Sequence, residues 1–162
     1  MDRKAQKHLS YANGYRQLGM FADAHSELAK IHPDFQEIKE VYVSSLAISS
    51  DEKDWEKVVE LGRYLATTFP DEVEWWVQWA YALRRSDSVD AARDILESAL
   101  VVFPVEPCLH YNLGCYACID GELDLAKGWL TRAIELESDY KLMAMDDEDL
   151  VDLKGWLQGM EN

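Results

Sequence analysis

Three cysteines lie close together in the sequence, where thiolates could bind a metal ion or take part in redox chemistry. Cys108, Cys115 and Cys118 are separated by seven and three residues. At a helical rise of about 1.5 Å per residue, Cys108 and Cys115 would be about 10 Å apart along the axis, too far for one zinc ion to bind both. Cys115 and Cys118 could supply two ligands, but the other two would have to come from elsewhere. The spacing favours ordinary, partly buried residues, and a metal or redox role is the minor alternative.

The remaining chemistry-bearing side chains form no recognisable catalytic pattern. The four histidines are scattered, and none lies beside a Ser or Cys in a nucleophile arrangement: His8, His25, His32 and His110. The sequence has no Gly-rich phosphate loop, and the acidic run at 146–149 lacks the alternating ligands and central Gly of a calcium loop. We therefore expect a non-enzymatic protein with no cofactor and no metal.

The elements that position these residues are helices. Between residues 107 and 138, apolar residues recur at helical spacing on both sides of a turn at Asp120-Gly121. The first set is Leu109, Leu113 and Tyr116, and the second is Leu123, Ala126, Leu130, Ala133 and Leu136. The pattern predicts a helical hairpin.

This hairpin resembles the tetratricopeptide repeat, a pattern with a period of about 34 residues. The matching residues are Leu113-Gly114, Gly121, Ala126, Leu130 and Ala133. Moving back along the chain by one repeat length at a time keeps the register, since the small-residue position falls on Ala126, Ala92, Val58 and Ala24. The second repeat departs most from the pattern, with Gly62 where a large residue is expected. We expect its hairpin to be the loosest.

The resemblance implies an all-α fold, a right-handed α-solenoid of antiparallel helix hairpins. We expect a single domain over 1–162, with repeats at about 5–38, 39–72, 73–106 and 107–140. The first five helices should span about 3–17, 21–31, 36–50, 54–68 and from an N-cap at Asp71 onward. A capping helix at about 147–160 should cover the last repeat with one apolar face, and its sequence resembles tails of bacterial tetratricopeptide proteins.

Three tryptophans in the third repeat, Trp75, Trp76 and Trp79, are spaced closely enough to form a binding site for a flat cofactor. The repeat pattern instead assigns Trp76 and Trp79 to packing between helices, while the role of Trp75 stays open.

In this family the first helix of each repeat lines a concave groove that holds peptides. The register assigns to the groove a mixture of aliphatic, aromatic, amide and guanidinium side chains that suits peptide capture. The candidate residues are Leu9, Ser10, Asn13 and Arg16; Val43, Ser44 and Ala47; Val77, Gln78, Tyr81, Arg84 and Arg85; and Tyr111, Asn112, Cys115 and Ile119. Arg84 and Arg85 could equally well complement the C-terminus of their own helix.

Charge and composition restrict the class of partner. The net charge of −15 argues against nucleic acid, whose binding requires concentrated Lys and Arg. Residues 1–50 are neutral overall, whereas 51–106 and 107–162 carry net charges of −7 and −8. The acidic part could attract a basic or amphipathic partner, although a solvated surface is the simpler explanation. Without an apolar run long enough for a membrane span, and with an odd number of cysteines, the protein is expected to be cytoplasmic.

The sequence thus predicts a protein–protein interaction module that binds a peptide or protein segment in its groove, as an adaptor or chaperone-like scaffold. Two other classes remain open. One is a self-associating structural protein, a homodimer formed through the second or third repeat. The other is a thiol or metal protein using Cys115 and Cys118.

Overall fold

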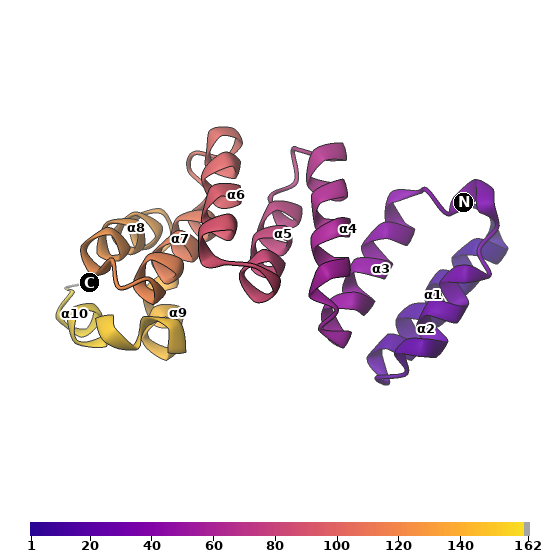
Figure 1. The fold of residues 1–162 in the computed structure, drawn as a ribbon, viewed down its shortest axis with the longest axis horizontal. Helices are drawn as coiled ribbons and strands as arrows, with labels where there is room; N and C mark the ends of the chain where they lie inside the picture. The colour runs from indigo at the N-terminus through magenta and orange to yellow at the C-terminus, as the bar shows by residue number, and fades with distance from the viewer. Residues whose placement is uncertain (161–162) are drawn as a thin grey trace. The chain divides into compact units, whose positions relative to one another are not determined.

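A computed structural model of the chain describes residues 1–160, which are helices joined by short turns (Figure 1). The contacts divide the chain into two compact units, residues 1–86 and 87–162. The first unit contains α1 (Arg3–Gln17), α2 (Phe21–Ala29), a short 3-10 helix η1 (Pro33–Phe35), α3 (Lys39–Glu52), α4 (Trp55–Thr68) and α5 (Val73–Ser86). The second contains α6 (Val89–Val102), α7 (Pro107–Ile119), α8 (Leu123–Leu136), α9 (Tyr140–Asp146), a 3-10 helix η2 (Glu148–Leu153) and α10 (Lys154–Gly159). The prediction that all of them form a single domain stays a prediction.

The turns within the hairpins follow the register of the repeat. Gly19, Lys53 and Gly121, which occupy the same repeat position in three hairpins, all have a positive φ, of 71°, 64° and 77°. Glycine adopts this left-handed conformation without a steric penalty, whereas Lys53 adopts it at a steric cost from its Cβ atom. The next residue in each hairpin is the N-cap of the second helix: Met20, Asp54, Ser88 and Glu122. The helices α3, α5 and α7 begin at residues 39, 73 and 107, the first residues of the predicted repeats.

Two predicted helix boundaries in the first unit are wrong by a few residues, and both for local reasons. The second helix ends at Ala29 instead of residue 31, because the Gln36 side chain donates hydrogen bonds to the carbonyls of Leu28 (2.9 Å) and Ile31 (2.6 Å). Together with the 3-10 turn that starts at Pro33, this delays the start of the third helix from residue 36 to Lys39.

The fifth helix also begins later than predicted, at Val73, so Asp71 is not adjacent to it and cannot be its N-cap. The acidic residue that contributes contacts here is Glu72, which pairs with Lys39 and accepts a hydrogen bond from Trp75 Nε1 at 3.2 Å.

The largest correction concerns the C-terminal cap. Instead of one helix over 147–160, the segment is broken into η2 and α10, and α9 precedes them. Leu150 has non-helical dihedral angles (φ −109°, ψ 18°). Asp147 is the N-cap of η2: its side chain accepts a hydrogen bond from Asp149 N (2.9 Å) and another from the Tyr111 hydroxyl (2.7 Å). The break itself lies at Leu150, which is buried in the segment that packs on α7. The predicted apolar face persists nevertheless, since Leu150, Leu153 and Leu157 are buried.

Gly62 brings α4 close to α5, the first helix of the third repeat. This contact lies between repeats, so the expectation that the second hairpin is the loosest stays a prediction. A Cβ atom at Gly62 would lie 3.1 Å from Cα and Cβ of Trp79, so α4 and α5 approach closely at this point. The bulk that the pattern expects at position 62 is supplied by Trp79 on the neighbouring helix. This contact agrees with the assignment of Trp79 to packing between helices. The contacts of Trp76 are local: its ring lies 6.2 Å from that of Trp79 on the same helix, and its indole N–H donates to the Pro70 carbonyl at 3.2 Å.

Acid should weaken the first unit through one buried carboxylate. Glu27 is buried and accepts from Lys30 Nζ at 2.6 Å, with His8 Nδ1 at 2.7 Å on its other oxygen. The hydrogen bond from Lys30, and then the one with His8, lowers the pKa of Glu27 below its usual 4.5. A carboxylate with a lowered pKa stabilises the fold above its unfolded pKa, and this stability is lost as the pH falls through the folded pKa.

We therefore expect Glu27→Gln to lower the urea midpoint at about pH 7 and to show a shallower loss of stability than the wild type towards about pH 3. The exposed Glu97 offers the matched control, because Glu97→Gln should follow the wild-type curve at every pH. Parallel curves for wild type and Glu27→Gln would contradict this role.

Candidate functional site: a groove on the first unit

The first unit has a groove formed by the first helix of each repeat, α1, α3 and α5. A cavity of about 360 Å³ is lined by residues from α1, α3 and α5: Arg16, Val43, Leu46, Ala47, Ser50, Asp51, Glu74, Trp75 and Gln78. Its aliphatic and aromatic members form the apolar wall, and the charged and amide side chains provide the polar edge. The sequence register assigned four of these residues to a peptide groove, and the structure brings Arg16, Val43, Ala47 and Gln78 together in one cavity.

The polar edge is organised by an ion pair between neighbouring repeats. Arg16 Nη1 lies 2.7 Å from Asp51 Oδ2, and both side chains are partly exposed. Asp51 balances the positive charge of Arg16. The remaining charge at the edge of the groove is the negative charge of Glu74. Two atoms of the wall, Arg16 Nε and Ser50 Oγ, are buried without a hydrogen-bond partner among the described residues. The chain therefore leaves the hydrogen-bonding groups of these two atoms unused.

Sequence reasoning missed the acidic residues and Trp75 of this cavity. A signal for Asp51 was present, because Arg16 and Asp51 have opposite charges and are separated by close to one repeat length. Lys39 and Glu72, which also form an ion pair, are separated by nearly the same number of positions. Opposite charges near the repeat spacing therefore indicate contacts between adjacent repeats in this chain.

The other candidates of the first unit do not line this cavity. Asn13 Nδ2 is 3.5 Å from Ser44 Oγ, which links α1 to α3 beside the groove. On α5, the Tyr81 ring packs edge-on against Trp55 at 5.7 Å, and the Tyr81 hydroxyl accepts a hydrogen bond from Arg85 at 3.0 Å. Val77 is half-buried, as is Arg84, which makes contacts of its own. The α5 contribution to the cavity comes from Glu74, Trp75 and Gln78, on a different part of the helix.

In the second unit, the chain itself covers the predicted peptide-binding residues. Tyr111 and Cys115 are buried, and both contact Asp147: the Tyr111 hydroxyl donates to Oδ2 at 2.7 Å, and the Cys115 thiol donates to the same atom at 3.6 Å. The Tyr111 ring also packs on Tyr140 at 5.0 Å. Asn112 donates to the Cys108 carbonyl of its own helix at 2.7 Å. The segment from α9 to η2 thus occupies the face of α7 where the register placed a ligand.

The same burial determines the state of the thiols. Burial and the nearby Asp147 carboxylate raise the pKa of Cys115, and burial also raises the pKa of Cys118. Both groups are therefore thiols at neutral pH, and a protonated thiol is a poor nucleophile and a poor metal ligand. Within residues 1–160, no cluster of three or more His, Cys, Asp and Glu side chains has an arrangement that could hold a metal ion.

The histidines take part in contacts between elements. His8 and His25 lie 2.7 Å from the carboxylates of Glu27 and Glu52, and the His110 ring nitrogen lies 3.1 Å from the Pro104 carbonyl. His32 lies at an N-cap, where its Nδ1 accepts from Asp34 N at 3.3 Å. Each contact is of a kind that holds helices and turns in place.

Every helix within residues 1–160 is too short or too polar to cross a lipid bilayer.

Comparison with known proteins identifies the architecture. No protein-family model and no curated protein matches the sequence. Among solved structures, the chain resembles a thermophilic TPR protein from Thermus thermophilus, with a TM-score of 0.66 and 18% sequence identity, over 94% of this chain and 82% of that one. The predicted all-α class is confirmed. The chain therefore has the helical-repeat fold of tetratricopeptide proteins.

Proposed function

We propose that this protein is a non-enzymatic interaction module that binds a segment of another protein in the groove of α1, α3 and α5. The observation that carries the proposal is the cavity itself, which joins an apolar wall to a polar edge on helices with the fold of tetratricopeptide proteins, the family whose grooves hold peptides. A wall of this kind takes up an apolar side chain, while the polar edge orients the segment that carries it.

The charges around the groove support a basic or amphipathic partner. Arg16 is offset by Asp51, so the remaining charge at the edge is that of Glu74. A segment with one large apolar side chain, flanked by Lys or Arg, would match both features. The net charge of −15 should also accelerate the encounter with such a segment at low salt.

The cysteines support a reducing compartment such as the cytoplasm as the place of action. Cys108, Cys115 and Cys118 form no disulfide in the structure, and two of them are buried as thiols.

An adaptor and a chaperone-like scaffold would both use the groove in the manner proposed.

A peptide selection followed by calorimetry tests the groove. Peptides selected from a random display library on the wild type should be rich in basic residues around one large apolar residue. Ala47→Arg would place bulk and positive charge in the cavity, and we expect it to weaken the selected peptides by at least about tenfold, or about 1.4 kcal/mol. The measurement is the Kd by titration calorimetry for variants of equal helicity.

A variant away from the cavity is the control. Val101→Asp changes a side chain of the second unit that is 85% exposed, and it should bind the same peptides as tightly as the wild type. Peptides that bind Ala47→Arg with wild-type affinity would exclude this groove as the binding site.

A further inference from the structure

The N-terminal helix presents an apolar face that no other helix of the first unit covers. A shallow depression of about 270 Å³ on α1 is lined by Ser10, Tyr11, Gly14, Tyr15 and Leu18. The exposed fractions of Tyr11 and Leu18 are 48% and 73%, and a Cβ atom at Gly14 would meet no atom within 4 Å. The large side chains that border this depression, Tyr11, Tyr15 and Leu18, recur at helical spacing, and together they are called the α1 ridge.

This ridge is flanked by positive charge. The helix α1 contains the basic residues Arg3, Lys4 and Lys7 and no acidic residue, while the charge of Arg16 is offset by Asp51. Arg3, Lys4 and Lys7 are exposed, and the Lys7 ammonium lies 5.3 Å from the centre of the Tyr11 ring. Two copies that met through α1 alone would bring like charges together, which disfavours a symmetric α1 dimer. The ridge instead suits a surface that is both apolar and acidic.

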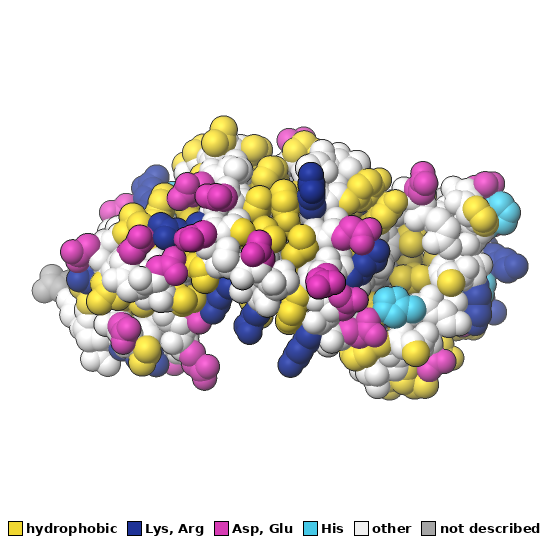
Figure 2. Space-filling view, in the orientation of Figure 1, with side chains coloured by type: hydrophobic (Ala, Val, Ile, Leu, Met, Phe, Trp, Pro, Cys, Tyr) yellow, Lys and Arg dark blue, Asp and Glu magenta, His cyan; other side chains and the backbone are white. Residues whose placement is uncertain are grey.

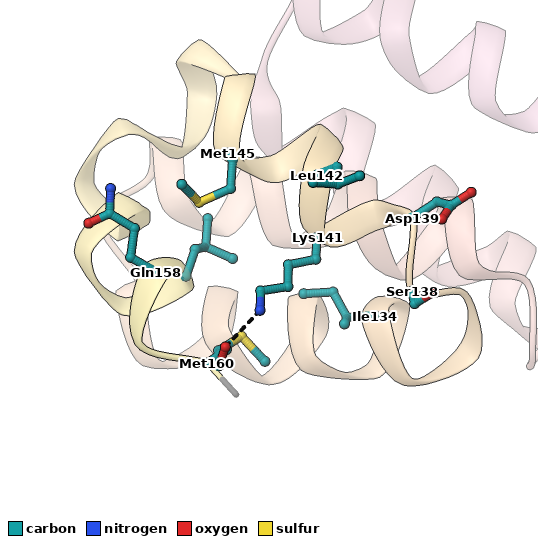
Figure 3. A pocket seen from close by; sticks show the side chains of 9 residues that line it. Ile134, Ser138, Asp139, Lys141, Leu142, Met145, Gln158 and Met160 are labelled. Carbon is teal, nitrogen blue, oxygen red and sulfur yellow. Dashed lines mark hydrogen bonds between the residues drawn. The ribbon is translucent and has the colours of Figure 1, made fainter. Parts of the chain in front are cut away.

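The second unit has a surface of that kind. A pocket of about 670 Å³ lies between α8, α9 and α10, and its apolar lining consists of Ile134, Leu142, Met145, Leu157 and Met160 (Figure 3). The Lys141 side chain crosses the pocket and donates to the Met160 carbonyl at 2.7 Å, and Asp139 lies at the edge of the pocket (Figure 3). Leu142 and its neighbour Met143 are 72% and 54% exposed.

The surroundings of this pocket are strongly acidic. Residues 87–162 contain 17 acidic and five basic side chains. On the face shown in Figure 2, Asp and Glu side chains are spread over the helices of this unit. The negative charge of the second unit therefore attracts a basic surface. The apolar side chains of the pocket can then be buried against apolar side chains of that surface.

From these two surfaces we infer that the protein associates with itself head to tail, with the α1 ridge of one copy inserted in the α8–α9–α10 pocket of a second copy. The ridge supplies Tyr11 and Leu18, and the pocket supplies the flexible Met145 and Met160. The helix that carries the ridge is basic, and the unit that carries the pocket is acidic. Methionine side chains adapt readily to the shape of an inserted side chain. Because the two surfaces differ, each bound copy leaves one ridge and one pocket unused, and further copies can add.

The expected behaviour of the wild type is a molar mass that rises with concentration in sedimentation velocity. The mass should fall when the salt is raised from about 0.05 M to about 0.5 M, since screening weakens attraction between exposed charges. Leu18→Asp and Leu142→Asp each disable one surface at a residue more than 70% exposed, so neither should affect folding, and each variant alone should stay monomeric.

Mixing these two variants provides the decisive test. Leu18→Asp keeps an intact pocket and Leu142→Asp keeps an intact ridge, so an equimolar mixture should form a heterodimer that does not grow further. Val101→Asp, which changes an exposed side chain outside both surfaces, should assemble like the wild type. A monomeric mixture would overturn the inference, as would a wild type that stays monomeric at all concentrations or a Leu142→Asp variant that still dimerises.

The test is independent of the proposed peptide groove. Ala47→Arg alters neither the ridge nor the pocket and should assemble normally, whatever its affinity for peptides.

Discussion

Replacing Leu150 with alanine is expected to lower the free energy of unfolding of the second unit by about 2–5 kcal/mol, the usual cost of truncating a buried leucine. Leu150 is fully buried in η2, the segment that packs on α7. The substitution removes apolar contact area and loosens the cover over Tyr111, which is held by Asp147 in the same segment. Urea unfolding measured by circular dichroism gives the energy, and hydrogen exchange of the α7 amides shows where protection is lost.

The adjacent residue is a matched control. Val151 is 61% exposed, so Val151→Ala should change the stability by no more than about 0.5 kcal/mol. If the two variants were equally stable, or if α7 kept its protection in Leu150→Ala, the segment 148–153 would not be the structural cover described above.

The second large effect concerns two Gly→Ala substitutions in the α7–α8 hairpin, one of which should lower the stability of the protein while the other raises it. Gly114 on α7 is buried, and a Cβ atom there would lie 2.7 Å from Leu130 Cγ and 2.9 Å from Leu130 Cδ2. Gly128 on α8 is exposed, and a Cβ atom there would meet no atom within 4 Å. Both positions gain about 0.5–1 kcal/mol of helix propensity from alanine, but only Gly114→Ala also forces a contact that costs about 1–3 kcal/mol.

We therefore expect Gly128→Ala to raise the urea midpoint and Gly114→Ala to lower it, with the difference between the two variants reporting the packing cost alone. The double variant should show the sum of the two effects, provided the sites are independent. A Gly114→Ala variant as stable as Gly128→Ala would mean that Leu130 moves aside without cost, and the close approach of α7 and α8 would not limit the choice of residue.

Much of the fold was predictable because the repeat pattern is local. A helix, its cap and the following turn depend on residues a few positions apart, and in this chain the same set recurs in every repeat. The turn at Gly121 and the repeat boundaries at 39, 73 and 107 follow from this recurrence, although the third and fifth helices were predicted to begin a few residues too early. The register also placed on one face four residues that line the α1–α3–α5 cavity, since it fixes which face of each first helix points away from the second helices.

The groove residues of the last repeat illustrate the limit of such reasoning. The register treats Tyr111 and Cys115 like the equivalent residues of earlier repeats, but in the structure Asp147, which follows the last repeat in the sequence, lies against both. The predicted capping helix is broken at Leu150, a buried residue of η2, which packs on α7. No local pattern contains this information.

By itself, the sequence determined the helical class, the repeat length, the turns and the face of each helix that is apolar, since these depend on short-range sterics and periodic burial. Only the tertiary structure decided that Trp79 fills the space above Gly62, that Arg16 pairs with Asp51 across the groove edge, and that the chain covers its own last inner helix. Each of these depends on side chains from different helices, far apart in the sequence, that meet only after the helices have packed.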